Sequence, residues 1–180
     1  MILSYEECIK KYKSDYQIRN QIFLQNLYKI EPGIYSDREH ESSIAVIMKK
    51  YPRAVFTLNS AFYYQGLTDV IPQKYYLLTN KDDAKIYDKR IKQCFDNYLS
   101  MDIGAEVINY NGDKIRVFSK ERLLIELVRN RTKLPFDYYK EIIGNYRKLV
   151  YELDFQAIEE YAEKLPKIKL VMKTIRLEVL

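Results

Sequence analysis

The sequence predicts a mixed α/β (α+β) fold: a reduced N-terminal winged helix-turn-helix, followed by a mixed domain with a small sheet and a helical C-terminal half. Three observations lead to this prediction. Two short helical segments and a Pro-Gly turn follow one another within residues 1–36. Strand-like runs then gather within residues 74–118, around an Asn-Gly turn. From Lys120 onward, apolar residues recur with helical spacing.

The composition favours an ordered protein in a reducing compartment. Of the 180 residues, 47% are hydrophobic and 31% are charged, which is enough apolar content to bury a core. Cys8 and Cys94 lie far apart without C-x-x-C spacing, so neither a zinc cluster nor a disulfide framework is predicted. No stretch has the length of a signal-peptide core or a bilayer-spanning helix, and we expect a cytoplasmic protein with no membrane partner. The net charge of +5 mildly favours acidic partners such as nucleic acid.

The first part of the chain predicts two helices separated by a tight turn. Ser4 can cap a short helix that runs through Ile9, and Ser14 can cap a second helix that runs to about Asn26. Within the second helix, Ile18 and the isoleucine one turn later can pack inward. The polar side chains of this helix then share another arc of its surface, formed by Gln17, Asn20 and Gln21 and flanked by Arg19.

A Pro-Gly turn follows the second helix. The apolar residues around Pro32-Gly33 are typical of a short two-stranded hairpin, namely Leu27, Ile30, Ile34 and Tyr35. Such a hairpin would be the wing of a reduced winged helix, whose second helix enters the major groove of DNA. We therefore assign residues 1–36 to a winged helix-turn-helix DNA-binding domain.

A polar, charge-dense segment, residues 36–41, separates this domain from the rest. Because it lacks apolar periodicity, we expect a hinge there and begin the second domain, residues 41–180, at its end. Two helices are expected next, at residues 42–50 and 57–65. Tyr51-Pro52 interrupts them because proline disfavours helix at the residue before it, and Gly66 ends the second helix.

The middle of the second domain predicts strands and its C-terminal half predicts helices. The strands are expected at residues 74–79, 105–109 and 114–118, and Asn111-Gly112 joins the last two as a hairpin. The first C-terminal helix carries one apolar stripe, made of Leu123, Leu124, Leu127 and Val128. Further helices are expected at about residues 136–149, 155–165 and 168–177.

The candidate catalytic residues do not combine into an active site. His40 lies in the predicted hinge and, being a single histidine, cannot supply both a catalytic triad and a metal site. Asp82-Asp83 follows a predicted strand, but no partner acid is evident, which favours a solvated turn over a metal site. Neither a phosphate-binding glycine loop nor the paired acids of a nucleotidyltransferase are present. We therefore predict no enzyme activity, no metal and no cofactor, with the cysteines as small core or interface residues.

Lysines surround the second predicted helix in positions that suit contacts to DNA phosphates, namely Lys10, Lys11, Lys13 and Lys29. A solvated face remains the alternative, because nearby acidic residues nearly cancel this charge: Glu6, Glu7, Asp15 and Glu31. A second basic run lies in the C-terminal half, at Arg129, Arg131, Lys133, Lys140, Arg147 and Lys148. It either extends a DNA footprint, meets an acidic protein, or is a set of solvated helix faces.

Several segments, taken in their order and spacing, are similar to a known family. They are Gly33-Ile34-Tyr35, Tyr51-Pro-Arg-Ala-Val-Phe-Thr-Leu-Asn-Ser-Ala-Phe-Tyr-Tyr-Gln-Gly-Leu-Thr68, Ile71-Pro72, Glu121-Arg122, Val128-Arg129-Asn130-Arg131 and Arg176-Leu-Glu-Val-Leu180. Over nearly its whole length the chain resembles the AbiEi antitoxins, partners of nucleotidyltransferase-like toxins in type IV toxin-antitoxin and abortive-infection systems. The family pattern usually has Thr and Asp where this chain has Leu123 and Glu126. From the residues alone, Glu121-Arg122 is simply a helix-starting charge pair.

The resemblance implies a repressor that binds double-stranded DNA at inverted repeats in its own promoter. It also implies that the C-terminal domain neutralises a nucleotidyltransferase-like toxin without a stable complex, as part of phage defence. On this reading, Gln17, Arg19 and Asn20, with Gln21 beside them, contact bases or the groove, and the four lysines contact phosphates. Inverted repeats further imply two copies on the DNA, a possible dimer.

Two other classes of function remain open. A winged-helix transcription regulator with a ligand-sensing or dimerisation domain would share every N-terminal feature. An enzyme acting on nucleic acid would need a carboxylate cluster that the sequence does not supply.

Overall fold

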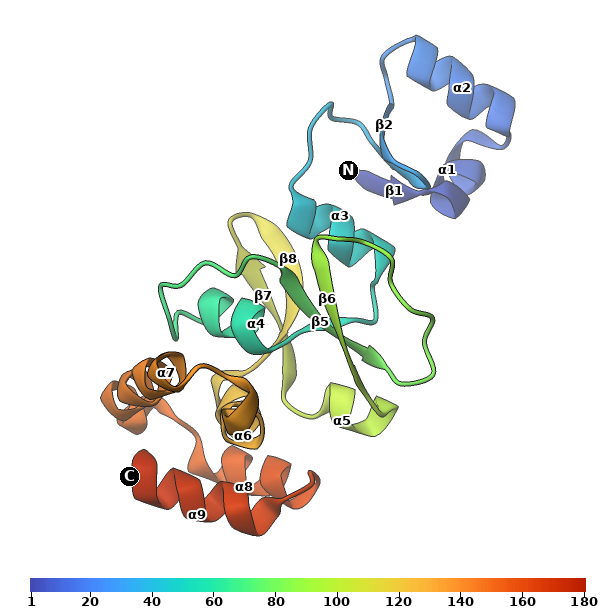
Figure 1. Cartoon of the computed structure of the whole chain (residues 1–180). Coiled ribbons are helices and arrows are strands. Elements are labelled where there is room, and N and C mark those ends of the chain that lie inside the picture. Colours follow the sequence, from blue (N-terminus) through green and yellow to red (C-terminus); the bar gives the residue numbers. More distant parts are fainter. The chain divides into compact units, whose positions relative to one another are not determined.

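The computed structural model describes the whole chain, residues 1–180, apart from the side chain of Tyr98. Its contacts define two compact units (Figure 1). Unit 1 comprises Met1–Arg53 and Asn109–Ile115, and unit 2 comprises Ala54–Ile108 and Arg116–Leu180. Both helices and strands occur in each, which confirms the mixed α+β composition. The segment that we expected to be a hinge, residues 36–41, lies inside unit 1.

Unit 1 is built on a small antiparallel sheet with the strand order β1-β3-β2. Its elements are β1 (Ile2–Ser4), α1 (Tyr5–Tyr12), α2 (Asp15–Phe23), β2 (Tyr28–Glu31), β3 (Ile34–Ser36) and α3 (Ser43–Lys50). The expected helices and hairpin are present, whereas β1 was not anticipated. Helix α2 ends at Phe23 rather than near Asn26, because Gln25 adopts a left-handed backbone conformation with φ of 58°.

The starts of α1 and α2 follow from their serine caps. The Ser4 hydroxyl accepts a hydrogen bond from the Glu7 amide, and the Glu7 carboxylate accepts one from the Ser4 amide, forming a capping box. The Ser14 hydroxyl accepts a hydrogen bond from the Gln17 backbone amide and so caps α2. Lys13 adopts a left-handed conformation with φ of 71°, which ends α1 and turns the chain into α2 within two residues.

Unit 1 has a core of its own. Leu3, Cys8, Ile18, Leu27 and Tyr35 are buried together, which joins both helices to the sheet. Helix α3 packs against the same sheet. Two ion pairs of 2.6 Å hold α3 in place. Lys49 pairs with Glu7 of α1, and Lys50 pairs with Glu31 of β2.

Unit 2 contains a five-stranded sheet with the order β6-β5-β4-β8-β7. The elements up to the sheet's last strand are β4 (Val55–Phe56), α4 (Leu58–Tyr64), β5 (Tyr75–Asn80), β6 (Ile91–Asp96), α5 (Tyr98–Asp102), β7 (Ala105–Tyr110) and β8 (Asp113–Phe118). The adjoining ends of β7 and β8, with the turn between them, are the part of this sheet that is counted with unit 1. Strands β5 and β6 are parallel, as are β4 and β8, while β4 and β5 are antiparallel. Two of these strands were not predicted: β4 is only two residues long, and the Lys-Gln-Cys segment of β6 lacks apolar alternation.

The C-terminal part of unit 2 is helical, as predicted. It comprises α6 (Lys120–Arg129), α7 (Phe136–Lys148), α8 (Phe155–Glu163) and α9 (Ile168–Glu178). Helix α6 packs against α4, α8 and α9, so its residues from Arg122 to Val128 are all buried. Among the helices of the described chain, none is both long and apolar enough to span a bilayer.

Candidate functional site

Helix α2 presents one face to the core of unit 1 and the opposite face to solvent. Ile18 is buried and Ile22 is half-buried, which fixes the inward side of the helix. At about 100° per residue, Tyr16, Asn20 and Phe23 then lie near the centre of the outward side. Tyr16 is 75% exposed and Phe23 is 84% exposed, so the core of unit 1 does not cover these two rings.

The four polar residues predicted on α2 differ in their surroundings. Gln17 is exposed, and Arg19 is exposed over 79% of its side chain while it pairs with Asp15 at 2.7 Å, one turn earlier. Asn20 is half-buried on the outward arc. Gln21 is half-buried, and its side-chain oxygen Oε1 accepts a hydrogen bond from the side-chain amide Nδ2 of Asn26 at 3.1 Å.

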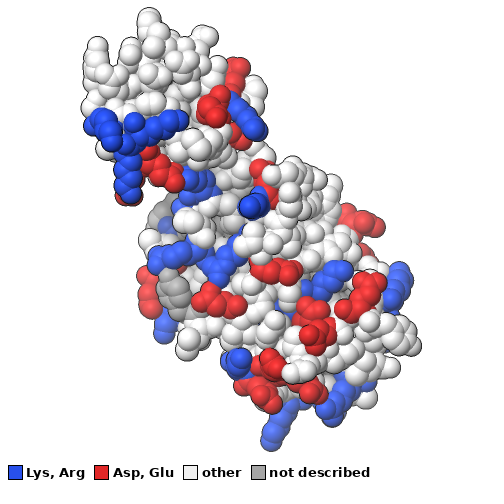
Figure 2. Space-filling model, turned by 180° about the vertical axis from the view of Figure 1, so that it is seen from behind, with Lys and Arg blue, Asp and Glu red and all other residues white. Residues whose placement is uncertain are grey.

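The predicted phosphate-binding lysines of unit 1 are all exposed. Lys10 and Lys11 lie in the last turn of α1, Lys13 lies at its end, and Lys29 lies on β2. The Lys11 ammonium also lies over the ring of Tyr12, 5.0 Å from its centroid. On the face drawn in Figure 2, basic side chains gather at one side of unit 1, while the surface at the α2 end is largely uncharged. On this face, the basic and the uncharged parts of the surface of unit 1 are therefore separate.

The apolar residues of this outward face were not among the predicted site residues. Besides Tyr16 and Phe23, Leu24 is 53% exposed directly after the helix. Their positions relative to Ile18 could have revealed them, because a residue about half a turn from a buried isoleucine points to solvent. Large apolar side chains held in solvent next to polar and basic residues are typical of binding surfaces.

In unit 2, the most buried charge is Arg122 on α6, whose exposure is 0%. Its guanidinium donates two hydrogen bonds to the Glu126 carboxylate, at 2.8 and 3.1 Å. It donates two more to the carbonyl oxygens of Ser100 and Ile103, at 3.0 and 3.2 Å, and lies 4.5 Å from the ring centroid of Phe118. Burial lowers the pKa of Arg122, and the adjacent carboxylate opposes that shift. The Glu121-Arg122 pair is therefore not simply a helix-starting pair.

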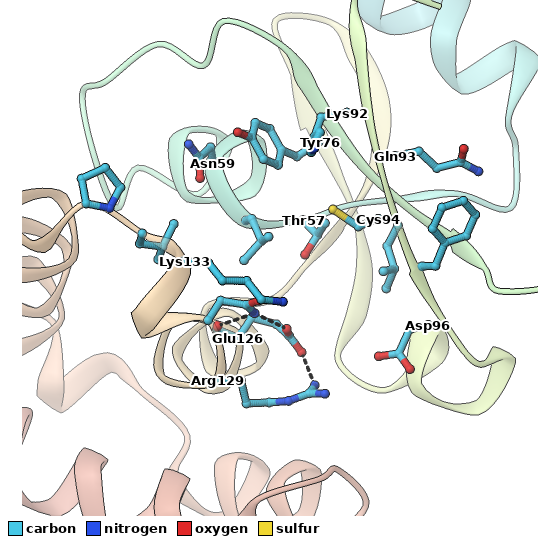
Figure 3. Close-up of a pocket in the computed structure, with 16 residues that line it drawn as sticks. Thr57, Asn59, Tyr76, Lys92, Gln93, Cys94, Asp96, Glu126, Arg129 and Lys133 are labelled. Carbon is cyan, nitrogen blue, oxygen red and sulfur yellow. Dashed lines mark hydrogen bonds and ion pairs between the residues drawn. The ribbon is translucent and has the colours of Figure 1, made fainter. Parts of the chain in front are cut away.

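Glu126 is shared among several donors. Besides Arg122, it accepts hydrogen bonds from Arg129 at 2.7 Å and from the side-chain amide of Asn130 at 3.2 Å (Figure 3). The oxygens of this carboxylate are thus engaged by side chains of α6 itself and of Asn130, the residue that directly follows it. Its role in the structure is to position Arg129 at the wall of a cavity of about 850 Å³.

The other titratable candidates stay apart from one another. His40 is exposed in unit 1. Asp82 and Asp83 lie in a turn after β5, where the Asn80 amide donates to Asp83 at 3.0 Å and the Asp82 amide donates to the Asn80 side chain at 3.1 Å. Burial raises the pKa of the Cys94 thiol, which disfavours the nucleophilic thiolate. No group of three or more metal-ligating side chains occurs among the residues that the structure describes.

Comparisons with known proteins bear on the fold. No protein-family model matches the chain, and no curated protein matches it either. A solved structure that does match is the RV2827C protein from Mycobacterium tuberculosis, with a TM-score of 0.67 and 9% sequence identity. The match covers 98% of this chain and 71% of the mycobacterial chain. The chain is thus similar in fold to that protein.

Proposed function

We propose that the chain is a DNA-binding repressor that acts as the antitoxin of a type IV toxin-antitoxin pair and carries no catalytic site. The observation that carries the DNA-binding half is the outward face of α2. The chain order β1-α1-α2-β2-β3, with β3 between the other two strands, suits a reduced winged helix in which α2 is the recognition helix and β2-β3 is the wing. Residues of this face then meet DNA directly.

In this proposal, different residues on and around the outward face contact different parts of the DNA. Gln17, Arg19 and Asn20 hydrogen-bond to base edges in the major groove. The exposed rings of Tyr16 and Phe23 contact thymine methyl groups, which are the apolar feature of that groove. The lysines named above neutralise phosphates and fix the register of the helix without reading sequence.

The ion pair between Arg19 and Asp15 is compatible with this role. Both side chains are substantially exposed, and an exposed pair of this kind contributes less than about 1 kcal/mol. A guanine edge that accepts two hydrogen bonds from Arg19 competes with such a weak partner. In the free protein Arg19 therefore pairs with Asp15, and in the complex with DNA a guanine takes the place of Asp15.

Gel-shift titration of the full chain against the DNA upstream of its own gene tests this half. Arg19→Ala should weaken specific binding by about fivefold to a hundredfold, which corresponds to the 1–3 kcal/mol of a bidentate base contact. The matched control is Lys173→Ala, which removes an exposed charge from α9 in unit 2. Equal losses in the two variants would contradict the assignment of α2 as the recognition helix.

The antitoxin half is supported by the segments that resemble AbiEi antitoxins, most of which lie in unit 2. Growth rescue tests it. The full chain is co-expressed with the nucleotidyltransferase-like protein encoded beside it, both as wild type and as Arg19→Ala. Rescue by both, with loss of promoter repression only in the variant, is the expected result. Rescue by neither would leave a DNA-binding regulator without antitoxin activity.

A second candidate function is a transcription regulator whose second unit senses a ligand. The specific observation in its favour is the cavity of about 850 Å³ in unit 2, because that volume falls within the range of small-molecule sites. This function would retain the DNA-binding face of α2 and would predict no rescue from the toxin.

A further inference from the structure

The cavity of unit 2 is framed by the sheet and by the end of α6. Strands β5 and β6 contribute one wall, with Tyr76 paired to Lys92 and Leu78 paired to Cys94 in the parallel register. Arg129 on α6 and the segment that follows it contribute another, and Leu58 and Asn59 of α4 complete the lining. In Figure 3, Lys92 on the sheet and Lys133 beyond α6 lie on different sides of the space.

Cationic side chains outnumber acidic ones in the lining of the cavity, which contains Lys92, Arg129 and Lys133 against Glu126 and Asp96. Glu126 is already occupied by Arg122 and Arg129, so its carboxylate is not available to balance a further cation. Lys92 and Lys133 are both exposed, and the described side chains give neither of them an ion pair. Asp96 is the other acid of the lining; its carboxylate accepts a hydrogen bond from the backbone amide of Asn97 at 2.8 Å, and in Figure 3 it lies apart from both lysines. Two unpaired ammonium groups facing one space favour an anion with several oxygens.

The rest of the lining combines polar side chains, among them Thr57 and Asn59, with apolar and aromatic ones. Leu58, Leu78, Leu134 and Pro135 contribute aliphatic surface, and Tyr76 contributes a half-buried ring beside Lys92. A free inorganic anion would leave the apolar part of the lining exposed to water. A molecule with a flat organic part and an anionic part would contact both the apolar and the cationic side chains.

We propose that this cavity binds a nucleoside phosphate. Lys92 and Lys133 contact the phosphate oxygens from two sides, Arg129 supplies a third cation held in place by Glu126, and the nucleoside packs against Tyr76 and its aliphatic neighbours. The proposal does not depend on DNA binding by unit 1 or on toxin neutralisation. It concerns binding alone and invokes no chemical step on the nucleotide.

Isothermal titration of the full chain tests the proposal with four probes: ATP, GTP, adenosine and inorganic triphosphate. We expect saturable binding of at least one of the two nucleotides, at least about tenfold tighter than binding of adenosine or of triphosphate. Lys92→Ala and Lys133→Ala should each weaken nucleotide binding about tenfold, and the double variant should abolish it. Lys173→Ala, on α9, is the matched control and should leave binding unchanged. Because all three lysines are exposed, the variants should fold normally, which circular dichroism checks.

Three results would overturn the proposal. Triphosphate binding as tightly as both nucleotides would show a simple anion site. Nucleotide binding unaffected in the double variant would place the nucleotide elsewhere on the molecule. Binding of a poly-glutamate peptide, with no nucleotide binding up to about 1 mM, would show that the cations serve an acidic protein segment at the exposed edge strand β6 instead.

Discussion

Replacing Glu126 with alanine should destabilise unit 2 far more than the loss of one surface charge would. The carboxylate is the only acid that the described contacts place against the Arg122 guanidinium, which has no exposed surface. Removing it leaves a buried cation whose other hydrogen bonds go to two backbone carbonyls. Removing one partner of a buried ion pair costs about 3–5 kcal/mol, because the remaining charge is desolvated without compensation.

Scanning calorimetry of the full chain measures this effect. For a unit of this size, a change of 1 kcal/mol shifts the melting temperature by about 4 °C, so Glu126→Ala should lower the transition of unit 2 by roughly 12–20 °C. The control is Glu159→Ala, which removes a 61% exposed carboxylate that lies 4.0 Å from Arg176 and should have little effect. A variant with both Arg122→Met and Glu126→Met should recover part of the loss, since no buried charge remains. A shift below about 4 °C for Glu126→Ala would refute the reasoning.

Three further predictions concern single contacts. Asp15→Asn should free Arg19 and tighten promoter DNA binding about two- to fivefold in the gel-shift titration, whereas weaker binding would mean that the ion pair presents Arg19 to DNA. The hydrogen bond from Lys49 lowers the pKa of Glu7 below its ordinary value of 4.5, so this pair stabilises unit 1 above that pH and loses its effect as the pH falls through the lowered pKa. Lys49→Met should therefore destabilise unit 1 at pH 7 and match the wild type near pH 2 in urea titrations, and a constant difference at both pH values would contradict this. Gly104→Ala should destabilise unit 2 by more than about 1 kcal/mol, because φ is +68° and the new Cβ would lie 2.6 Å from a buried arginine side chain; an unchanged melting temperature would contradict it.

The local elements could be predicted from sequence where they depend on neighbouring residues. Ser4 and Ser14 begin their helices as expected, because a capping hydroxyl reaches an amide only three residues away. The Asn-Gly turn likewise joins β7 and β8 as expected. Strand β1 could not be found in this way, because its three residues are a strand only by pairing with β3, more than thirty positions later. The same holds for β6, whose polar segment is fixed by its parallel partner β5.

The candidate interface on α2 was predicted in part. Gln17, Arg19 and Asn20 were selected because their side chains can hydrogen-bond to bases, and all three lie outside the core of unit 1. Tyr16 and Phe23 were not among the residues predicted for this face. The orientation of the helix is set by Ile18, which is buried, and by Ile22, which is half-buried, and it leaves both rings in solvent. The sequence indicates the polar candidates of this face, whereas the packing of α2 leaves exposed aromatic rings beside them.

The cavity of unit 2 was beyond reach of the sequence because its parts are distant along the chain. An Arg and a Glu four residues apart on a helix are typical of a solvated surface pair. Only the carbonyl oxygens contributed by residues 100–103 and the packing of α6 among other helices make this pair buried. The buried Arg122 holds the Glu126 carboxylate by hydrogen bonds, and Glu126 in turn holds Arg129. Arg129 lines the cavity together with two lysines that have no ion-pair partner in the described contacts. The buried guanidinium of Arg122 therefore connects an ordinary Arg-Glu spacing in the sequence to the position of Arg129 in the lining of the cavity.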